Sequence, residues 1–490
     1  MNIISQDYEN ELVNFIKNKI LEKIIKTSSS FVYNILHFSN NKYLNWVSDL
    51  DYNLRQLFID ILQEAIKFID DKFRNSEERK KRYHVNIKED IRNLRIASIG
   101  EITITRTYYE TKDRKEHFYF IDQLLGLNKF ERYDSVFKAT TINLAMKTNQ
   151  KLGGELIGEM YSDMKDLLSE KDNSISRQTV FNWVKNWNVP KIIYAPIDID
   201  GDTLYIMGDE KYIHEQFRKI INNSEDEDKK KQIMSKCFVC FSGISQKGKR
   251  RKLNDRFVFL TKSKSPWNDF LDAVTSVYDF EKIKKIVFLS DAGSWLLSGA
   301  PDLKMYPHNK IILCLCEFHV RQKINRITTN QDYRDKLNEF IDSNDKKGFK
   351  NFMLKIKDEK KSDSKRLETL NKYENYIVKH WKKIQNMFAS PCRSSMESHI
   401  SHFVASYFSS RPKAYSDDTI EKLLKLQEYK LNGINLTNLY LASYKNNEVI
   451  TIKKEDLDFS IFESNSSSNI PIIETGINFS LYSLLTSIAH

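Results

Sequence analysis

The chain has 490 residues, of which 40% are hydrophobic and 12% aromatic, so it is expected to fold into roughly two to four domains rather than stay disordered. Lys and Arg outnumber Asp and Glu by 77 to 66, and the formal charge of +11 favours a polyanionic partner over an acidic protein surface or a neutral metabolite. Neither a long apolar run nor a signal peptide is present, and the five cysteines are an odd number, which predicts a cytoplasmic protein with free thiols and no membrane segment.

Two regions with different periodicity make up the N-terminal part. Apolar residues recur at helical spacing within residues 1–90, as from Leu54 to Ile66, and this region ends in the charged stretch Glu77–Arg82. Residues 91–130 contain two β-rich runs separated by Gly100, followed after a polar turn by HFYFID. We therefore expect a helical N-terminal region and then a small β element.

Residues 131–190 are predicted to be helical and to end in a short, capped helix. Ser174 or Ser176 stands where a helix N-cap belongs, and Val180 and Val184 follow at the spacing of a buried face. The polar residues that this helix would expose are Arg177, Gln178 and Asn182. A short helix with a polar first turn is what a helix-turn-helix protein inserts into the major groove, so these three are candidates for DNA contacts. The alternative is an ordinary surface helix of a bundle.

The order of elements in residues 191–319 predicts a mixed five-stranded sheet. The apolar runs are LYIMG from Leu204, CFVCFSGI from Cys237, RFVFL from Arg256, IVFL from Ile286 and IILCL from Ile311. A helix opened by Ser265-Pro266 separates the third run from the fourth. Three strands, a helix and two further strands form the order of an RNase H-like fold, which belongs to the α/β class.

The remaining residues are expected to interrupt and then complete this fold. Residues 320–390 have a helical and highly charged pattern, which predicts an all-α insertion. Residues 391–435 contain two helical segments that would pack back on the sheet, and residues 436–490 are predicted to be a C-terminal tail.

Three carboxylates occupy positions from which they can meet. In the predicted strands, Asp209 ends the first and Asp291 ends the fourth, while Glu397 lies on the helix that returns to the sheet. A pair of Mg²⁺ ions about 4 Å apart, held by a few carboxylates, is suited to cleaving and joining phosphodiesters, with Mn²⁺ as a substitute. We therefore expect Asp209, Asp291 and Glu397 to be catalytic metal ligands. Glu210 is the alternative to Asp209, since adjacent residues point to opposite sides of a strand, and Asp202 is a more distant one.

Basic residues near these elements are candidates for contacts to phosphates. They are Arg250 and Arg251 in the basic turn 247–252, Arg321, Lys323 and Arg326 after the fifth strand, and Arg411 and Lys413 after the last carboxylate. Such charges are usually solvated, and any that bind DNA would add affinity that depends on salt and not on sequence.

Several segments together carry a resemblance to a known family. They are LYIMGDEKYIHEQ, FLSDAGSW, Cys316-Glu317-Phe318-His319, SSMESHISHFVASYFSSRPKAYS and, upstream, IASIGEITITRTYY. In this combination the chain resembles the ISLre-type bacterial insertion-sequence transposases, also catalogued as an uncharacterised transposase-like family. The resemblance extends from about residue 91 to about residue 416.

This resemblance implies a DDE transposase related to the Mutator-type group, associated with the nucleoid. On that match Asp209, Asp291 and Glu397 carry over as metal ligands, and Cys316 and His319 match a C/D-x-x-H signature that supports the active site and binds DNA. Double-stranded DNA is then the expected partner, as transposon terminal inverted repeats and as target, bound by a homodimer or a higher oligomer.

Two departures from the family pattern keep other functions open. Glu210-Lys211-Tyr212 replaces a glycine-rich context after the first acid, and Trp295 follows a serine after the second acid. One alternative is a catalytically inactive, transposase-derived DNA-binding protein. Another is an RNase H-like recombination nuclease, which would cut DNA without joining 3′ ends to a target.

Overall fold

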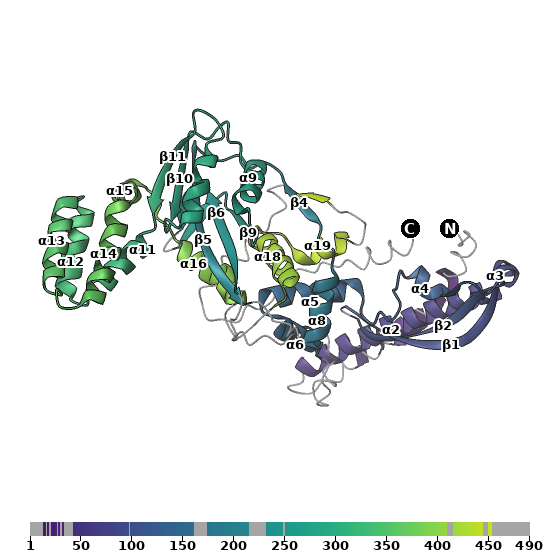
Figure 1. Ribbon diagram of the computed structural model, residues 1–490. Helices are drawn as coiled ribbons and strands as arrows, with labels where there is room; N and C mark the ends of the chain where they lie inside the picture. Colours follow the sequence, from purple (N-terminus) through teal and green to yellow (C-terminus); the bar gives the residue numbers. More distant parts are fainter. Residues whose placement is uncertain are drawn as a thin grey trace, which may run out of the picture.

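The computed structural model describes residues 43–97, 99–160, 174–214, 232–247, 250–408, 415–443 and 449–452, with short stretches between residues 13 and 33. The described parts form an elongated molecule. Figure 1 shows a helical part made by residues 317–389 at one end, a sheet in the middle, and a long helix lying on a β-hairpin at the other end. No helix among these residues has the length and apolar character needed to cross a membrane.

The N-terminal part is a three-stranded antiparallel sheet with one face covered by helix α2 (Tyr43–Asn75). The sheet consists of β1 (Tyr83–Ile96), β2 (Gly100–Thr111) and β3 (His117–Tyr119), and helices α3 (Glu77–Arg82) and α4 (Phe120–Leu124) flank it. Ile66 and Phe73 of α2 pack on Leu94, Ile102 and Ile104 of the strands. Strand β1 begins eight residues before the predicted start at residue 91. The prediction missed this outer half because it is mostly exposed and has no apolar run.

Three helices follow the small sheet: α5 (Ser135–Lys147), α6 (Gln150–Met160) and α8 (Arg177–Asn186). The predicted cap is Ser176, whose hydroxyl accepts a hydrogen bond from the backbone N–H of Thr179 at 3.2 Å. Helix α6 packs closely on the segment before α8. A side chain at Gly154 would place its Cβ 2.1 Å from the carbonyl oxygen of Ile175. A glycine is therefore required where α6 meets the segment that leads into α8.

The central element is a mixed five-stranded sheet in the order β11-β10-β5-β6-β9. Its strands are β5 (Thr203–His214), β6 (Gln232–Phe241), β9 (Phe257–Thr261), β10 (Lys285–Ser290) and β11 (Lys310–Leu315). Strand β6 is antiparallel to both of its neighbours, β5 and β9, whereas β10 runs parallel to both β5 and β11. The sheet is thus antiparallel on one side and parallel on the other. A separate two-stranded sheet pairs β4 (Lys191–Tyr194) with β12 (Val449–Ile452) in parallel.

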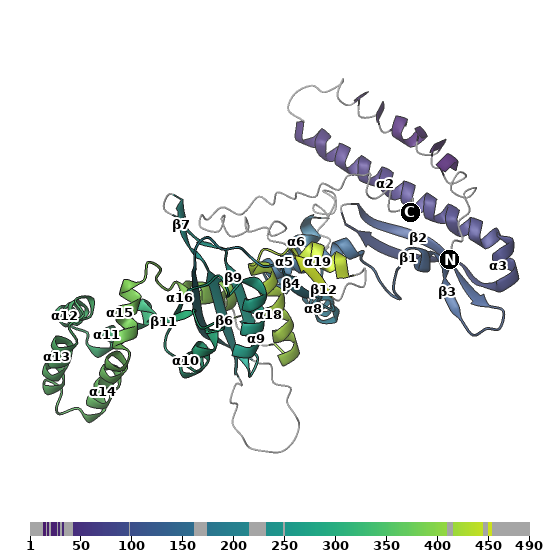
Figure 2. The same cartoon turned by 90° about the horizontal axis from the view of Figure 1, so that it is seen from above.

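Two strand predictions were wrong in detail. Strand β5 does not end at Gly208 but continues to His214, because the polar residues after Asp209 pair with the first half of β6. The predicted second strand, 237–244, is divided between β6 and β7 (Gly243–Lys247), and β7 forms a hairpin with β8 (Arg250–Asn254). Lys247 and Arg250 of the basic turn form the last described pair of this hairpin, which projects from the sheet, as Figure 2 shows.

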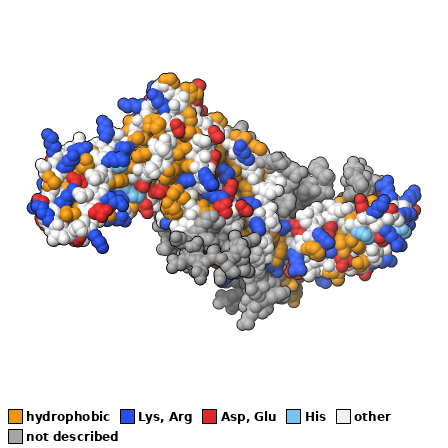
Figure 3. All heavy atoms as spheres, viewed as in Figure 1, with side chains coloured by type: hydrophobic (Ala, Val, Ile, Leu, Met, Phe, Trp, Pro, Cys, Tyr) orange, Lys and Arg blue, Asp and Glu red, His pale blue; other side chains and the backbone are white. Residues whose placement is uncertain are grey.

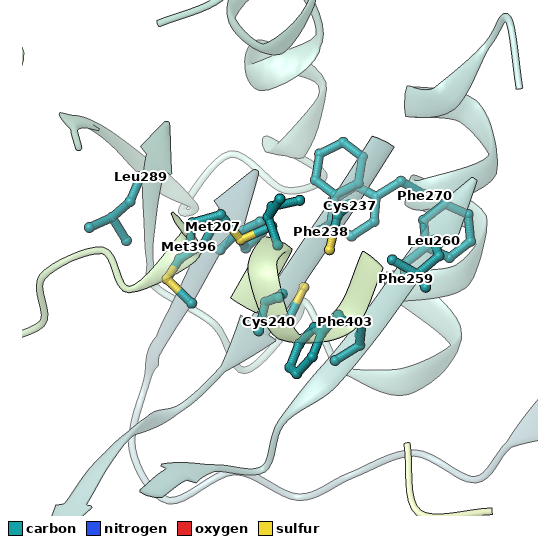
Figure 4. Packing of buried hydrophobic residues seen from close by; sticks show 14 of the residues in the cluster. Met207, Cys237, Phe238, Cys240, Phe259, Leu260, Phe270, Leu289, Met396 and Phe403 are labelled. Carbon is teal, nitrogen blue, oxygen red and sulfur yellow. The ribbon is translucent and has the colours of Figure 1, made fainter. Parts of the chain in front are cut away.

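Each face of the central sheet is covered by helices. Helices α9 (Pro266–Val277) and α10 (Ser294–Gly299), with a 3₁₀ turn at Ala300–Leu303, cover one face, where Phe238 stacks on Phe270 at 4.0 Å. The other face is covered by α16 (Met396–Ile400), a π-helical turn (Ser401–Ala405) and α17 (Ser406–Phe408). Figure 4 shows Met396 next to Met207 on this second face.

Residues 317–389, which we call the insertion, form five helices joined to the end of the sheet. They are α11 (Glu317–Ile327), α12 (Gln331–Asp342), α13 (Lys346–Asp358), α14 (Ser364–Lys379) and α15 (Trp381–Ala389). The Asn386 side chain of α15 donates to the carbonyl oxygen of Leu313 in β11 at 2.9 Å, so the last helix is fixed to the edge of the sheet. In Figures 1 and 2, α13 is the helix of the insertion farthest from the sheet.

Edge strand β9 is protected by side chains of helix α18 (Asp417–Leu431), which α19 (Leu436–Ser443) follows. The side chain of Asn432 accepts from the backbone N–H of Val258 and donates to its carbonyl oxygen, both at 2.8 Å. The carboxylate of Glu428 accepts from the N–H of Leu260 at 2.9 Å. These contacts replace the hydrogen bonds that a sixth strand would make, and an edge left open would invite pairing with another chain.

Replacing Asn432 by Leu is expected to lower the free energy of unfolding by about 2–5 kcal/mol, because two buried backbone groups of Val258 lose their partner. Asn432 is only 2% exposed, so water cannot take its place without opening the packing. Urea denaturation measures the effect. Asn438→Leu, at an exposed position of α19, is the matched control; equal stability of the two variants would contradict this role.

Candidate active site

Asp209 lies inside strand β5, at the centre of the sheet. Its cross-strand partner is Cys237 of β6, and the next residue toward the N-terminus, Gly208, faces the opposite side. A Cβ on Gly208 would lie 2.6 Å from the Leu296 side chain of α10, so Gly208 faces α9 and α10. Asp209 therefore faces the side of α16, and it is 9% exposed.

Three side chains from separate elements meet on this side of the sheet. Asp209 of β5, His319 of α11 and Glu397 of α16 each have a potential ligand atom, and these atoms all lie within 4.8 Å of one another. Glu397 is exposed in the first turn of α16, and His319 is half-buried. Two of the three predicted carboxylates are thus close together, and the third side chain of this group is the histidine of the Cys316–His319 motif.

Asp291 is next to this group but is held by its own turn. It directly follows β10, and its Oδ1 accepts the backbone N–H of Gly293 at 2.7 Å. Ala292 between them has a φ of +63°, a left-handed conformation that is uncommon for a residue other than glycine. The hydroxyl of Tyr376, from α14 of the insertion, donates to the carbonyl oxygen of Asp291 at 2.6 Å. The strained turn is therefore fixed by the insertion.

The electrostatic environment of Asp209 is unfavourable for a free carboxylate. Burial and, after it, the negative charges of Asp291, Glu210 and Glu397 together raise its pKa to about 7. A hydrogen bond from the backbone N–H of Glu210, at 2.8 Å, acts in the opposite direction. A buried carboxylate with like charges around it is stabilised when a cation binds, as at many metal sites.

Glu210, the alternative to Asp209, points elsewhere. Its carboxylate accepts a hydrogen bond from the indole Nε1 of Trp295 at 2.5 Å. The ammonium group of Lys236 lies 5.9 Å from the centre of the same indole ring. Glu210 thus belongs to a contact with Trp295 and is not in the group formed by Asp209, His319 and Glu397. Trp295, one of the departures from the family pattern, is the residue that holds Glu210.

His319 is positioned by the first turn of helix α11. The helix begins after Cys316, which is 3% exposed and whose backbone N–H donates to the carbonyl oxygen of Ser290 at 2.7 Å. The neighbouring Cys316 side chain is the main cause that raises the pKa of His319, and Asp291 and Glu397 add to it while burial opposes it. Nδ1 of His319 is buried and has no hydrogen-bond partner among the described residues.

The predicted contact residues on α8 and on the β7–β8 hairpin belong to elements outside this group. Arg177, Gln178 and Asn182 are exposed on α8, as expected, while Val180 and Val184 are buried. Gln178 donates to Asn182 at 2.9 Å, so two of the three polar side chains bind each other. Arg251 is exposed on the β7–β8 hairpin, and Arg250 lies in β8. Arg411 and Lys413 lie outside the described residues.

Two residues of the insertion adjoin the site without having been predicted. Tyr376 binds the Asp291 backbone, and its ring lies 5.1 Å from the imidazole of His380 in an edge-to-face contact. The charge of Asp291 also acts on the pKa of His380, which burial and two nearby lysines lower. No local signal marks these residues, because they lie within a charged helical pattern that looks the same along its whole length.

The chain matches one protein family over most of its length. The model of an uncharacterised protein family, UPF0236, matches residues 42–443. UPF0236 protein TTE0402 of Caldanaerobacter subterraneus subsp. tengcongensis is 24% identical over 453 residues, which are 89% of this chain and 84% of that protein. Another UPF0236 protein of this bacterium, whose name joins eleven locus labels from TTE0033 to TTE2212, is 23% identical over 467 residues, 91% of this chain and 92% of that protein.

Among solved structures, the Drosophila P element transposase strand transfer complex aligns with 70% of this chain and 87% of that chain, at 13% identity and a TM-score of 0.23. A TM-score this low does not establish a shared fold. The family match is of a different kind, since it covers α2 to α19 with the whole central sheet and the insertion. This chain therefore belongs to the uncharacterised protein family UPF0236.

Proposed function

We propose that this protein is a DDE-type DNA transposase with an RNase H-like core, whose carboxylates Asp209, Asp291 and Glu397 hold divalent metal ions. The observation that carries the proposal is the meeting of Asp209, His319 and Glu397, from three elements far apart in the chain, beside the Asp291 turn. The sheet order β11-β10-β5-β6-β9 supports it, because three antiparallel strands followed by two parallel ones is the RNase H-like arrangement.

The residues present fit a divalent cation. Asp209 is a buried carboxylate with three others near it, and the Nδ1 atom of His319 is buried without a hydrogen-bond partner in the part of the chain that the structure describes. A buried carboxylate among like charges and a buried ring nitrogen without a partner both lower the stability of the metal-free protein, and a bound cation would directly offset the repulsion at Asp209. Asp209, Asp291 and Glu397 would hold the metal, and His319 would either join them or orient them. Because one donor is an imidazole, Mn²⁺ fits this set better than Mg²⁺, which prefers oxygen ligands.

The proposed reaction is phosphoryl transfer in two steps. In the first, water attacks the phosphorus at a transposon end, the bond to the 3′ oxygen breaks, and the 3′ oxygen leaves as a hydroxyl group. In the second, this 3′-OH attacks a phosphodiester of the target DNA and displaces another 3′ oxygen. Divalent metal ions stabilise the attacking and leaving oxygens of such a displacement. The chain contributes a rigid platform: Asp209 is fixed in a central strand, and Tyr376 fixes the turn of Asp291.

DNA is the proposed partner, with terminal inverted repeats bound specifically and target DNA bound through its backbone. The exposed polar residues Arg177, Gln178 and Asn182 on α8 remain the proposed readers, with Arg250, Arg251, Arg411 and Lys413 as phosphate contacts. Two ends must be paired for joining, so we propose a homodimer or a higher oligomer on DNA. The relative with eleven locus labels supports a mobile element, since transposition produces many copies of one gene in a genome.

A strand-transfer experiment tests the function. The purified protein is incubated in Mn²⁺ or Mg²⁺ with labelled DNA fragments taken from both flanks of the gene, together with a supercoiled target plasmid. Transfer of label into the plasmid supports the transposase. If the DNA is bound but never cut, the proposed transposase is wrong and the protein is the inactive DNA-binding protein. If the DNA is cut but never joined to the plasmid, the result favours the recombination nuclease.

A further inference from the structure

The helical insertion carries most of the net charge of the chain. Residues 320–390 contain eighteen Lys and Arg against ten Asp and Glu, so this segment supplies eight of the formal +11 charges. Figure 3 shows Lys and Arg side chains gathered over this part of the molecule. An excess of this size on about one seventh of the chain favours a polyanion as the ligand.

One group of these cations lies beside the carboxylate site. The ammonium group of Lys383 is 3.3 Å from Nδ1 of His380, and the His380 ring contacts the ring of Tyr376. The ammonium group of Lys323 lies 5.3 Å from the centre of the Tyr376 ring. Tyr376 in turn binds the Asp291 backbone. We call Lys323, Lys379, His380 and Lys383 the insertion cluster, with Lys379 included because its charge acts on both His380 and Lys383.

The insertion cluster is not neutralised within the described residues. Other cations of the insertion have carboxylate partners, such as Arg321 with Asp342 at 2.8 Å and Lys361 with Asp358 at 2.8 Å. In the described part of the chain, no carboxylate oxygen lies within 4.0 Å of the ammonium groups of Lys323, Lys379 and Lys383. Burial and the charge of Lys379 lower the pKa of Lys383. Such crowding of like charges is relieved when an anion binds.

From this geometry we infer that the insertion cluster binds a phosphodiester of the DNA strand that enters the carboxylate site. The inference rests on the proposed function, because it places the phosphate next to Asp291. Lysine ammonium groups bind phosphates as point charges, and the buried His380 with the half-buried Tyr376 holds two of them at a fixed place on the insertion. The insertion would then act as a clamp that keeps the strand in register with the catalytic carboxylates.

The salt dependence of DNA binding tests this inference without any cleavage. Anisotropy of a labelled duplex of flanking DNA is measured over a range of NaCl concentrations in Ca²⁺, for the natural protein and for Lys323→Ala/Lys379→Ala/Lys383→Ala. Each phosphate contact contributes about 0.9 to the slope of log K against log salt, so the variant is expected to lose about 1–3 of slope. A matched control, Lys347→Ala/Lys350→Ala/Lys360→Ala, removes the same charge from exposed positions on α13 and the loop after it.

An unchanged slope in the cluster variant, or an equal loss of slope in the control, would overturn the inference. DNA would then be attracted by the positive charge of the insertion as a whole. The variant Lys323→Arg/Lys379→Arg/Lys383→Arg keeps the charges and is expected to retain the salt slope. If the alanine variant does not fold, the slope of this arginine variant is compared with that of the variant Lys323→Gln/Lys379→Gln/Lys383→Gln, which is expected to lose slope. The failure of the proposed function is separate. If the protein never cuts DNA, the cluster variant can still lose salt slope, and then only the proposed function fails. If the protein is an active transposase but the cluster variant keeps the natural slope, only this inference fails.

Discussion

Asp209→Asn is expected to reduce metal-dependent cleavage of transposon-end DNA by at least about 1,000-fold, because several kcal/mol of transition-state stabilisation are lost with one metal ligand. The asparagine keeps the size of the side chain and can still accept the N–H of Glu210, so the fold and DNA affinity should persist. The rate of nicking of a plasmid that carries the gene with its flanks, in Mn²⁺, measures the effect. Asp291→Asn is expected to behave in the same way.

Glu210→Gln is the matched control for Asp209→Asn. It removes the neighbouring carboxylate, but glutamine can still accept the hydrogen bond from Trp295 on the other side of the strand. We expect this variant to retain most of its cleavage rate. If Glu210→Gln were inactive and Asp209→Asn active, the first metal ligand would be Glu210 and the proposed arrangement of the site would be wrong.

The sequence predicted the parts of the fold that depend on local pattern. The strands around Ile286 and Ile311 and the helix Asp417–Leu431 were found because each is an apolar run or an amphipathic stretch bounded by polar residues. The second half of β5 was missed because Lys211 to His214 are mostly polar and become a strand only by pairing with β6. Pairing between distant segments leaves no local signal, and the outer half of β1 was missed for the same reason.

The proximity of two carboxylates in the candidate site could be predicted, but the full group and its geometry could not. Asp209 and Glu397 do lie close together, as their positions on adjacent elements predicted. The sequence could not tell that His319 would be the third member of the group, since a histidine in the first turn of a helix is usually a surface or capping residue. Nor could it tell that Oδ1 of Asp291 would be engaged by Gly293, because that contact depends on the left-handed backbone of Ala292.

The binding of Mn²⁺ is expected to strengthen about tenfold for each pH unit up to about pH 7 and then to level off. A metal must displace the proton of its carboxylate ligand, and burial, followed by the neighbouring negative charges, raises the pKa of Asp209 to about 7. Isothermal titration calorimetry with Mn²⁺ alone measures this dependence. Affinity that stays constant between about pH 6 and about pH 8 would mean that Asp209 is not a ligand.

Raising the pH is expected to have the opposite effect on the stability of the metal-free protein, because of the same carboxylate, Asp209. Below pH 3.8, the ordinary pKa of an aspartate side chain, Asp209 is protonated in both the folded and the unfolded chain, so its ionisation has no effect on folding there. Between 3.8 and about 7 only the unfolded chain has lost the proton, so the metal-free protein loses stability as the pH rises through this window. At about pH 8 the penalty is complete and on the order of 4 kcal/mol.

Asp209→Asn cannot ionise, so the metal-free variant should be more stable than the natural protein at about pH 8, and the difference should shrink as the pH falls toward 4. Thermal unfolding of both proteins in EDTA, and again in Mn²⁺, measures this. Mn²⁺ is expected to raise the unfolding temperature of the natural protein and to leave that of Asp209→Asn nearly unchanged. A variant that is less stable at high pH would mean that Asp209 contributes to folding, whereas a more stable one identifies a carboxylate kept at a cost to stability in order to bind a cation.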